Sequence, residues 1–237
     1  MEKFRALGID VRTSTFVEGI EKRGAVYRVR ASTSEGAPIS IDADLVVHAA
    51  GRAANFDGMQ LEAAGIAMRS GRLELNEFLQ SVSNPAVYAA GDAAQMGPPL
   101  TPVSNHEAKV VAANMLEGNH ARPDYRGVPS VAFTLPPIAA VGLSEDEARA
   151  QGRKFRTKSQ KTSGWFTARQ AAESVYGFKV LVEEDTELVL GAHLVGPHVD
   201  EVINLFALAI RHGLTAANLK ATMFAYPTGA SDIGYML

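Results

Sequence analysis

The chain contains no cysteine, and this absence removes several kinds of chemistry at once. Without thiols, its 237 residues hold no disulfide framework, no thiolate metal site and no cysteine nucleophile. The lack of cysteine also fits a reducing compartment. We therefore expect a cytoplasmic protein that folds without covalent cross-links.

Long apolar segments and a strong charge of one sign are also missing. No apolar run approaches the roughly 18 residues that span a bilayer. Residues 1–5 have no apolar stretch behind them that would indicate a signal peptide. The net charge is −3 with both signs mixed, which does not favour a nucleic-acid partner. The apolar content of 46% is enough for a sizeable core in one large domain or two small ones. We therefore expect neither a membrane nor a nucleic acid as partner.

The glycine fingerprint of dinucleotide-binding domains does not occur either. That motif, Gly-x-Gly-x-x-Gly, opens such a domain at a strand-to-helix turn. Residues 1–47 show shorter strand patterns, at residues 8–11 after a helix end and in a hairpin of residues 26–31 and 39–41. This is too little for a complete nucleotide-binding domain.

Residues 87–92, Val-Tyr-Ala-Ala-Gly-Asp, form the most informative segment that is present. The pattern is a short apolar strand that ends in glycine and aspartate. Gly91 lets the backbone approach a ligand without a Cβ in the way. Asp92 places a carboxylate at the end of the strand, where open α/β sheets bind cofactors and where it can accept hydrogen bonds from sugar-like hydroxyls. The alternative interpretation is an ordinary turn.

Two further segments accompany that motif. Residues 44–52 are another apolar strand pattern, which ends at Gly51 and Arg52. Leu100, Thr101 and Pro102 begin a helix that runs to about residue 116, and the amides at a helix N-terminus favour negative charge. The alternatives are relief of strain at a strand end and an ordinary helix start.

The polar, proline-containing residues 119–129 indicate a domain boundary, and the chain after them has the pattern of an α+β module. A capping box at Ser144 and Glu147 starts one helix, and Thr215 caps another. The other expected elements are a strand at 130–134, an antiparallel pair at 178–182 and 188–195, an amphipathic helix at 200–212 that stops at Gly213, and a short helix at 216–223.

The histidines and the single tryptophan carry no strong functional signal. No pair of the six histidines has the spacing of a known metal motif, so we expect no metal site. Trp165 lies in a polar stretch, and we interpret it as a packing or interface residue rather than a ligand stacker.

Taken in order, these motifs resemble the class I flavin-dependent pyridine nucleotide-disulfide oxidoreductases, the family of glutathione reductase, dihydrolipoamide dehydrogenase and mercuric reductase. The resemblance continues through residues 131–138, 140–145 and 191–197. It covers nearly the whole chain, but only the C-terminal half of the family's pattern. It implies FAD and NAD(P)H as cofactors. The implied fold class is α/β plus α+β, with partial nucleotide-binding and FAD-binding segments before an α+β dimerisation domain.

The resemblance also implies a domain division and a set of site residues. Residues 1–47 would end the NAD(P)-binding domain, 48–125 would contact FAD, and 126–237 would form a homodimer. An N-terminal half, possibly a separate polypeptide, would supply the site for the flavin pyrophosphate. The implied cofactor-binding residues are Gly51, Gly91, Asp92, Leu100, Thr101, Pro102, Tyr226 and Pro227.

The C-terminus departs from the family pattern at two positions. Members that reduce disulfides carry His-Pro-Thr there, with a glutamate five residues after the histidine, and this pair moves protons. Tyr226 takes the place of the histidine and Ser231 that of the glutamate, while Asp232 is one position late. A tyrosine phenol is a poor base at neutral pH. We therefore expect no catalytic acid–base residue in this chain.

Two hypotheses of different kinds follow. The first is the C-terminal portion of an FAD-dependent NAD(P)H oxidoreductase with a non-disulfide acceptor, such as a quinone or dye, or with a transhydrogenase-like activity. The second is a non-catalytic dimerisation module or truncated product that binds no flavin.

Overall fold

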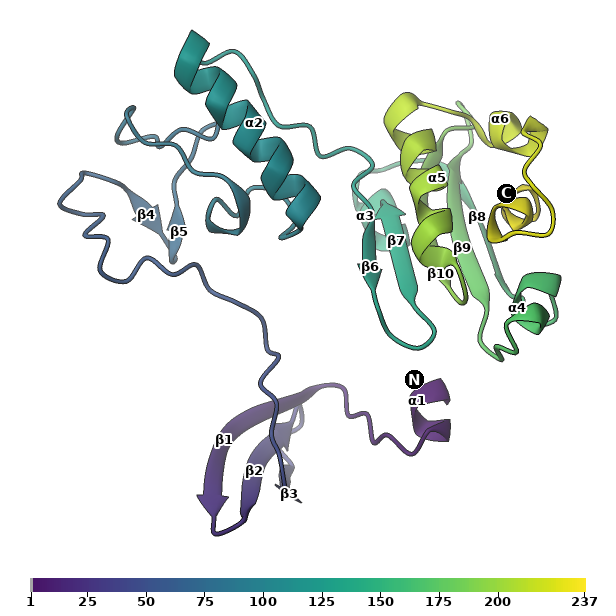
Figure 1. The fold of residues 1–237 in the computed structure, drawn as a ribbon, viewed down its shortest axis with the longest axis horizontal. Helices are drawn as coiled ribbons and strands as arrows, with labels where there is room; N and C mark the ends of the chain where they lie inside the picture. Colours follow the sequence, from purple (N-terminus) through teal and green to yellow (C-terminus); the bar gives the residue numbers. More distant parts are fainter. Residues whose placement is uncertain (1) are drawn as a thin grey trace. The chain divides into compact units, whose positions relative to one another are not determined.

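The computed structural model describes residues 2–237 and divides into two compact units, one up to Ala53 and the other from Ala54 to Leu237. All sheets are antiparallel (Figure 1). Within the described residues, no helix has the length and apolar character needed to cross a bilayer. The elements are α1 (Glu2–Ala6), β1 (Thr15–Arg23), β2 (Val26–Thr33), β3 (Pro38–Ala43), β4 (Met68–Arg69), β5 (Arg72–Leu73), the 3-10 helix η1 (Gly91–Ala93), α2 (Thr101–Glu117), β6 (Ser130–Ala132), β7 (Ile138–Gly142), α3 (Glu145–Ala150), β8 (Phe155–Lys161), α4 (Phe166–Gln170), β9 (Gly177–Glu183), β10 (Val189–Val195), α5 (Val199–His212), α6 (Ala216–Ala221), the 3-10 helix η2 (Gly229–Asp232) and α7 (Ile233–Met236).

The first unit is a short helix followed by a three-stranded sheet in the order β1-β2-β3. The hairpin expected from residues 26–31 and 39–41 is confirmed as the pairing of β2 with β3. Its apolar residues are mostly uncovered, since Phe16 and Val17 are each 64% exposed. This sheet buries too little apolar surface to be stable without a covering layer.

Three strands predicted from short apolar patterns are absent. Residues 8–11 and residues 45–49 form no strand, and residues 87–90 make only an isolated bridge between Tyr88 and Gln80. Leu45 and Val47 are 75% and 77% exposed. These predictions are wrong because a strand needs a neighbour along its edge, and the described chain offers none there.

The helix α2 organises the segment between residues 54 and 127, which otherwise contains one small hairpin and irregular chain. One face of α2 is buried, at Val103, Glu107, Val110 and Asn114. The side chain of Asn114 takes the place of backbone hydrogen bonds in this irregular segment. Its amide nitrogen donates to the carbonyls of Phe78 and Ala121, and its oxygen accepts from the backbone amides of His120 and Ala121. Residues far apart in the sequence are thereby attached to one helix.

The C-terminal part is an α+β module, as predicted. Its five-stranded sheet has the order β6-β7-β10-β9-β8, and α5 lies along one face (Figure 1). Val180 and Val182 on β9 belong to the core on the α5 side, where Phe206 is fully buried. Leu181 belongs to a second, smaller cluster with Ala148 of α3. Because the centre of β9 is covered on both faces, residues 180–182 are apolar without alternation.

Most predicted boundaries in this module are confirmed. Ser144 and Glu147 form the predicted capping box, and Thr215 caps α6 together with Asn218. Gly213 ends α5 in the left-handed conformation. The short helix predicted at 216–223 ends earlier, at Ala221, because the chain becomes extended at Thr222.

Candidate functional site

Gly91 and Asp92 lie in η1, which packs on the first turns of α2. Gly91 has a φ of +72°, in the left-handed region that favours glycine. A Cβ at this position would lie 3.0 Å from Oγ of Ser104. Both the backbone conformation and the close approach to α2 therefore require glycine here.

Asp92 presents its carboxylate to solvent. The side chain is exposed, and no hydrogen bond or ion pair engages it within residues 2–237. A carboxylate that only closes a turn usually accepts hydrogen bonds from nearby backbone amides. Within the described residues, the acceptor capacity of Asp92 is therefore unused.

The N-terminus of α2 is open beside this turn. Leu100 is the N-cap residue and makes no side-chain cap, while Thr101 and Pro102 are exposed in the first turn. The amides of Val103 and Ser104 donate back to the Leu100 carbonyl, whereas the Thr101 amide has no acceptor within residues 2–237. This end of α2 therefore offers a donor and the positive end of the helix dipole to an anionic or polar group.

The loop between these two features contains one unsatisfied polar atom. Oε1 of Gln95 is buried and has no hydrogen-bond partner within the described residues. Gln95 also has a positive φ of 54°. On the surface of this segment, the Asp92 carboxylate is therefore an open acceptor and the Thr101 amide an open donor.

Glu107 holds this turn in place, and the sequence reasoning did not identify it. It is 1% exposed; its Oε2 accepts from the Gly91 amide at 2.6 Å, and its Oε1 accepts from the Tyr125 hydroxyl at 2.6 Å. The desolvation of Tyr125 and its hydrogen bond to Glu107 raise the pKa of that phenol far above its usual range. A sequence signal existed, because Glu107 lies between Val103 and Val110 on one face of the helix.

Gly51 belongs to the other unit. It has a φ of +89°, and a Cβ there would meet nothing within 4 Å. The left-handed conformation accounts for glycine at this position. Gly51 lies in the first unit, whereas Gly91 and Asp92 lie in the second.

The C-terminal residues that replace the proton-handling pair lie in the α+β module. Tyr226 is 78% exposed, and its ring centre lies 6.2 Å from that of Phe166. Ser231 donates to the Thr228 carbonyl. Asp232 points inward, and its Oδ2 accepts from Thr167 Oγ1 at 2.8 Å and from the Tyr176 hydroxyl at 2.9 Å. Asp232 therefore anchors the C-terminus and does not substitute for the missing glutamate.

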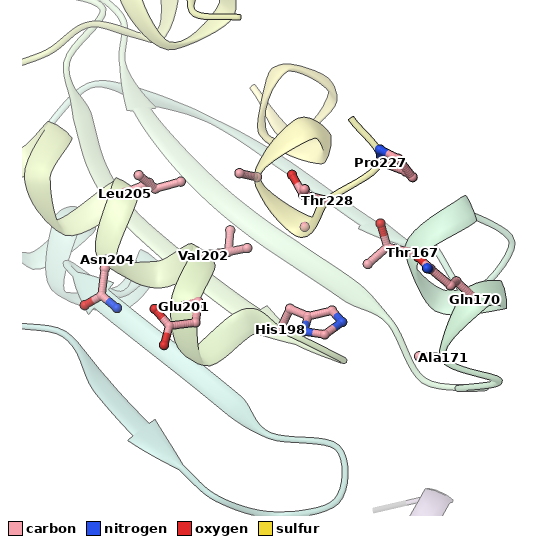
Figure 2. Close-up of a pocket in the computed structure, with 12 residues that line it drawn as sticks. Thr167, Gln170, Ala171, His198, Glu201, Val202, Asn204, Leu205, Pro227 and Thr228 are labelled. Carbon is pink, nitrogen blue, oxygen red and sulfur yellow. The ribbon is translucent and has the colours of Figure 1, made fainter. Parts of the chain in front are cut away.

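Two cavities flank this C-terminal segment. One, of about 410 Å³, has three aromatic rings in its wall, from Phe224, Tyr226 and Tyr235, and also contains Ser231. The other, of about 850 Å³, lies between α4, the start of α5 and the 227–230 turn, where Pro227 is exposed (Figure 2). Neither cavity includes Gly91, Asp92 or Thr101. Tyr226 and Pro227 therefore line two different cavities, and neither cavity includes the α2 turn.

Within residues 2–237, no group of three or more histidine or acidic side chains could hold a metal ion. Three histidines have structural partners: His193 contacts the Leu143 carbonyl, His120 contacts the Gly118 carbonyl, and His106 Nε2 accepts from the Asp124 amide. Trp165 is half-buried and packs its ring against Tyr176 and Phe178. These residues need no ligand to explain them.

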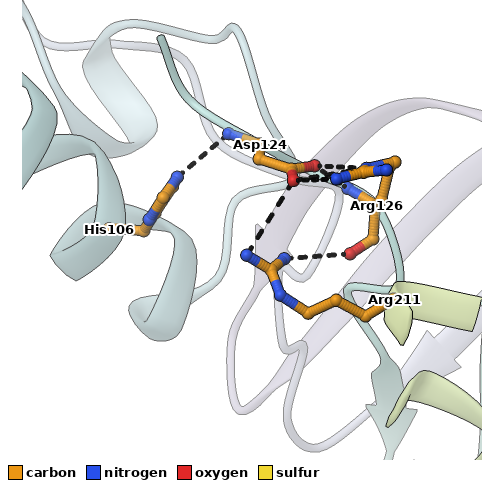
Figure 3. A network of polar contacts seen from close by, with 4 residues as sticks. All are labelled: His106, Asp124, Arg126 and Arg211. Atoms are coloured by element: carbon orange, nitrogen blue, oxygen red, sulfur yellow. Dashed lines mark hydrogen bonds and ion pairs between the residues drawn. The ribbon is translucent and has the colours of Figure 1, made fainter. Parts of the chain in front are cut away.

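A polar network joins α2 to α5 through the linker (Figure 3). Arg126 contacts both carboxylate oxygens of Asp124, and Arg211 lies 3.9 Å from the same carboxylate. Arg211 also donates to the Arg126 carbonyl. These hydrogen bonds, chiefly from Arg126, hold the pKa of Asp124 well below its usual range. The linker is therefore an ordered connection within this unit.

Comparison with known proteins gives matches along the chain. The family profile described as "Pyridine nucleotide-disulphide oxidoreductase" matches residues 1–108, and the dimerisation domain of the same family matches residues 128–236. An "Uncharacterized 19.7 kDa protein in mercuric resistance operon" of Staphylococcus aureus is 49% identical over 180 residues, which is 76% of this chain and 100% of that protein.

Longer relatives match over part of their length. A mercuric reductase of Lysinibacillus sphaericus is 32% identical over 95% of this chain and 41% of its own. The flavoprotein disulfide reductase RclA of Escherichia coli superposes with a TM-score of 0.86 at 24% identity, over 99% of this chain and 53% of that one. The chain thus spans about half the length of these two proteins. Enzymes of the matched family use FAD and NAD(P)H. From its two family matches and these relatives, the chain belongs to the pyridine nucleotide-disulphide oxidoreductase family and carries its dimerisation domain.

Proposed function

We propose that this chain is the C-terminal portion of an FAD-dependent NAD(P)H oxidoreductase whose electron acceptor is not a disulfide. The observation that carries the acceptor proposal is the pair Tyr226 and Ser231, which stand where a disulfide reductase needs a base and its carboxylate partner. Asp232, which follows Ser231 in the chain, is engaged by Thr167 and Tyr176. A quinone, a dye or a second nicotinamide can accept electrons without such a base.

The proposal divides the chain into three functional parts. Residues 1–47 close the NAD(P)-binding domain, residues 48–125 contact FAD, and residues 126–237 form the homodimer interface. An N-terminal half, in the same or another polypeptide, supplies the remaining flavin contacts. We place the protein in the cytoplasm, since it has no cysteine to pair in an oxidising compartment.

The FAD-contacting residues in this proposal are Gly91, Asp92, Leu100, Thr101 and Pro102. When bound, FAD supplies the acceptance of hydride from NAD(P)H and the release of electrons. Asp92 accepts hydrogen bonds from the ribityl hydroxyls. The α2 N-terminus lies beside the ring, where its dipole stabilises negative charge.

Gly51, Tyr226 and Pro227 complete the proposed cofactor contacts. Gly51 approaches the nicotinamide nucleotide. Tyr226 and Pro227 reach the flavin pocket of the partner subunit, where Tyr226 offers an aromatic face and a hydroxyl. The aromatic wall of the neighbouring cavity, formed with Phe224 and Tyr235, suits a planar acceptor better than a peptide-like disulfide.

A second candidate function is a dimerisation module that binds no flavin. It is favoured by the absence of the glycine fingerprint and by the short relative from the mercuric resistance operon, which matches over its full length. A chain that carries only part of the FAD site makes only part of the contacts with FAD. These contacts must still offset the whole entropy that is lost when the ligand is immobilised. We therefore expect the isolated chain not to hold FAD tightly.

The two candidates are separated by measurements on the chain and on a complete enzyme that contains it. Purified chain with near-stoichiometric flavin absorbance favours the enzyme, whereas a colourless dimer favours the module. In the complete enzyme, we expect NAD(P)H to reduce quinones and dyes but hardly glutathione disulfide or lipoamide. Disulfide turnover on the order of 10 per second would contradict the acceptor proposal.

A further inference from the structure

Within residues 2–237, Glu107 is the one acidic side chain that is almost completely buried, at 1% exposed. No lysine or arginine within residues 2–237 forms an ion pair with it. Burying a carboxyl group without a cation is unfavourable unless hydrogen bonds compensate. Its two oxygens find that compensation in the Gly91 amide and the Tyr125 hydroxyl, each at 2.6 Å.

The first hydrogen bond fixes the exposed turn. Gly91 is held in its left-handed conformation by the contact with Glu107, and Asp92 follows directly. Asp92 itself has no partner within residues 2–237, so nothing on its own side chain orients it. The direction of its carboxylate therefore depends on the bond between Gly91 and Glu107.

The second hydrogen bond connects the turn to the linker. Tyr125 lies between Asp124 and Arg126, which form the network with Arg211 of α5. Its ring also packs on the loop after η1, since a Cβ on Gly97 would lie 2.4 Å from it. One tyrosine thus contacts both the carboxyl group that holds the turn and the loop that leads to the α2 N-terminus.

We propose that Glu107 is a positioning residue that presents Asp92, and that Tyr125 makes this presentation depend on the ordered linker. The inference rests on the proposed function only for the identity of the group that Asp92 meets. Tyr125 keeps Glu107 directed at Gly91, so a change in the linker alters the α2 turn without contact with any ligand.

The test measures hydrogen exchange of the 89–96 segment in the complete 237-residue chain, where no flavin is needed. Glu107→Leu removes both acceptors. Glu107→Gln is the conservative variant, because its oxygen can accept from Gly91 while its amide donates to Tyr125. Tyr125→Phe removes only the linker contact. Glu117→Leu, at the exposed end of the same helix, is the matched control.

We expect Glu107→Leu to raise exchange of the turn about tenfold to a hundredfold, which is the effect of losing a hydrogen bond to a carboxylate. Glu107→Gln should restore most of the protection. Tyr125→Phe should raise exchange of the turn by a smaller factor. Turn exchange in Glu107→Leu that equals the Glu117→Leu control would overturn the proposal. If Glu107→Leu does not fold, unchanged exchange in Tyr125→Phe would still remove the linker's role.

The same substitutions in a complete enzyme that contains this chain, titrated with FAD and followed by flavin fluorescence, separate this inference from the proposed function. A loosened turn in the chain together with weakened FAD binding in the enzyme supports both. A loosened turn with FAD binding equal to that of the unchanged enzyme leaves the inference in place and contradicts flavin contact by Asp92. A turn that stays protected overturns the inference whatever the FAD titration gives.

Discussion

Asp92 and Asp232 show how the surroundings of two aspartates separate their roles. Asp232 accepts two hydrogen bonds inside the α+β module, and the burial of the Tyr176 ring, together with the charge of Asp232, raises the pKa of that phenol. Asp92 is exposed and has no partner within residues 2–237. The carboxylate of a structural aspartate accepts hydrogen bonds from its own chain. The carboxylate of an aspartate that binds a ligand has oxygens free to accept hydrogen bonds from that ligand.

Asp92→Ala should therefore leave folding intact and weaken flavin binding. In a complete enzyme that contains this chain, we expect a loss of about tenfold to a hundredfold in FAD affinity, from a missing hydrogen bond to a carboxylate. The thermal unfolding of the chain itself should not change, because no contact within it is lost. Asp146→Ala, at another exposed aspartate, is the control. FAD retention equal to that of the control would mean that Asp92 is only a turn residue.

At the scale of elements, the centre of the α+β sheet depends on two facing glycines. Gly191 of β10 pairs with Gly142 of β7. A Cβ on Gly191 would lie 2.1 Å from the Leu143 carbonyl oxygen, and one on Gly142 would lie 2.2 Å from that of Leu190. The backbone at Leu143 and the backbone at Leu190 can therefore approach these two positions only because Gly142 and Gly191 have no Cβ.

Gly191→Ala should destabilise this module by about 1–3 kcal/mol or more, since a methyl group would have to displace backbone. Gly164→Ala is the matched control, because a Cβ there meets nothing within 4 Å. Urea unfolding of both variants measures the difference between their free energies of unfolding. A free energy of unfolding for Gly191→Ala within about 0.5 kcal/mol of the control would show that β10 can move without cost.

The linker network predicts a dependence of stability on acid. The pKa of Asp124 is lowered in the folded chain, so its contribution is complete above the ordinary value of about 3.9 and is lost as the pH falls below it. Asp124→Asn should therefore be less stable than the unchanged chain at pH 7, and this gap should narrow in acid. Urea unfolding from pH 7 to pH 3 tests this, with exposed Asp185→Asn as control. If the difference in unfolding free energy between Asp124→Asn and the unchanged chain is the same at pH 7 and pH 3, the network does not stabilise the chain through the charge of Asp124.

At the scale of the whole molecule, large apolar side chains remain exposed in both units. Val47 in the first unit, Leu116 at the end of α2, and Phe133 after β6 are 77%, 85% and 84% exposed. Apolar surface of this extent usually marks contacts with other chains or segments. It fits the proposal that further flavin-binding structure and a second subunit cover this chain.

The predicted homodimer should use the outward face of α5. Val202 and Phe206, which the helical pattern places on the apolar face, are buried against the sheet and cannot form an interface. Leu208 lies on the other side and is 50% exposed. We expect Leu208→Glu to lower the dimer fraction in light scattering, and Leu116→Glu on α2 to leave it unchanged. A monomer mass for the unchanged chain at micromolar concentration would remove the prediction.

The sequence alone determined the elements whose signals are local. A capping box, a glycine after a helix and a helical apolar stripe each specify their own few residues, so Ser144, Gly213 and α5 were predictable. The ordered motifs around Gly91, Leu100 and Pro136 also indicated the family. No packing information was needed for either.

Tertiary structure decided what depends on neighbours. The strand patterns at residues 45–49 and 87–90 formed no strand, because a strand exists only where another chain segment pairs with it. Glu107 could not be assigned from the sequence, since its role depends on Gly91 and Tyr125, 16 and 18 residues away. A buried carboxyl group acquires a function only from the donors that folding brings to it.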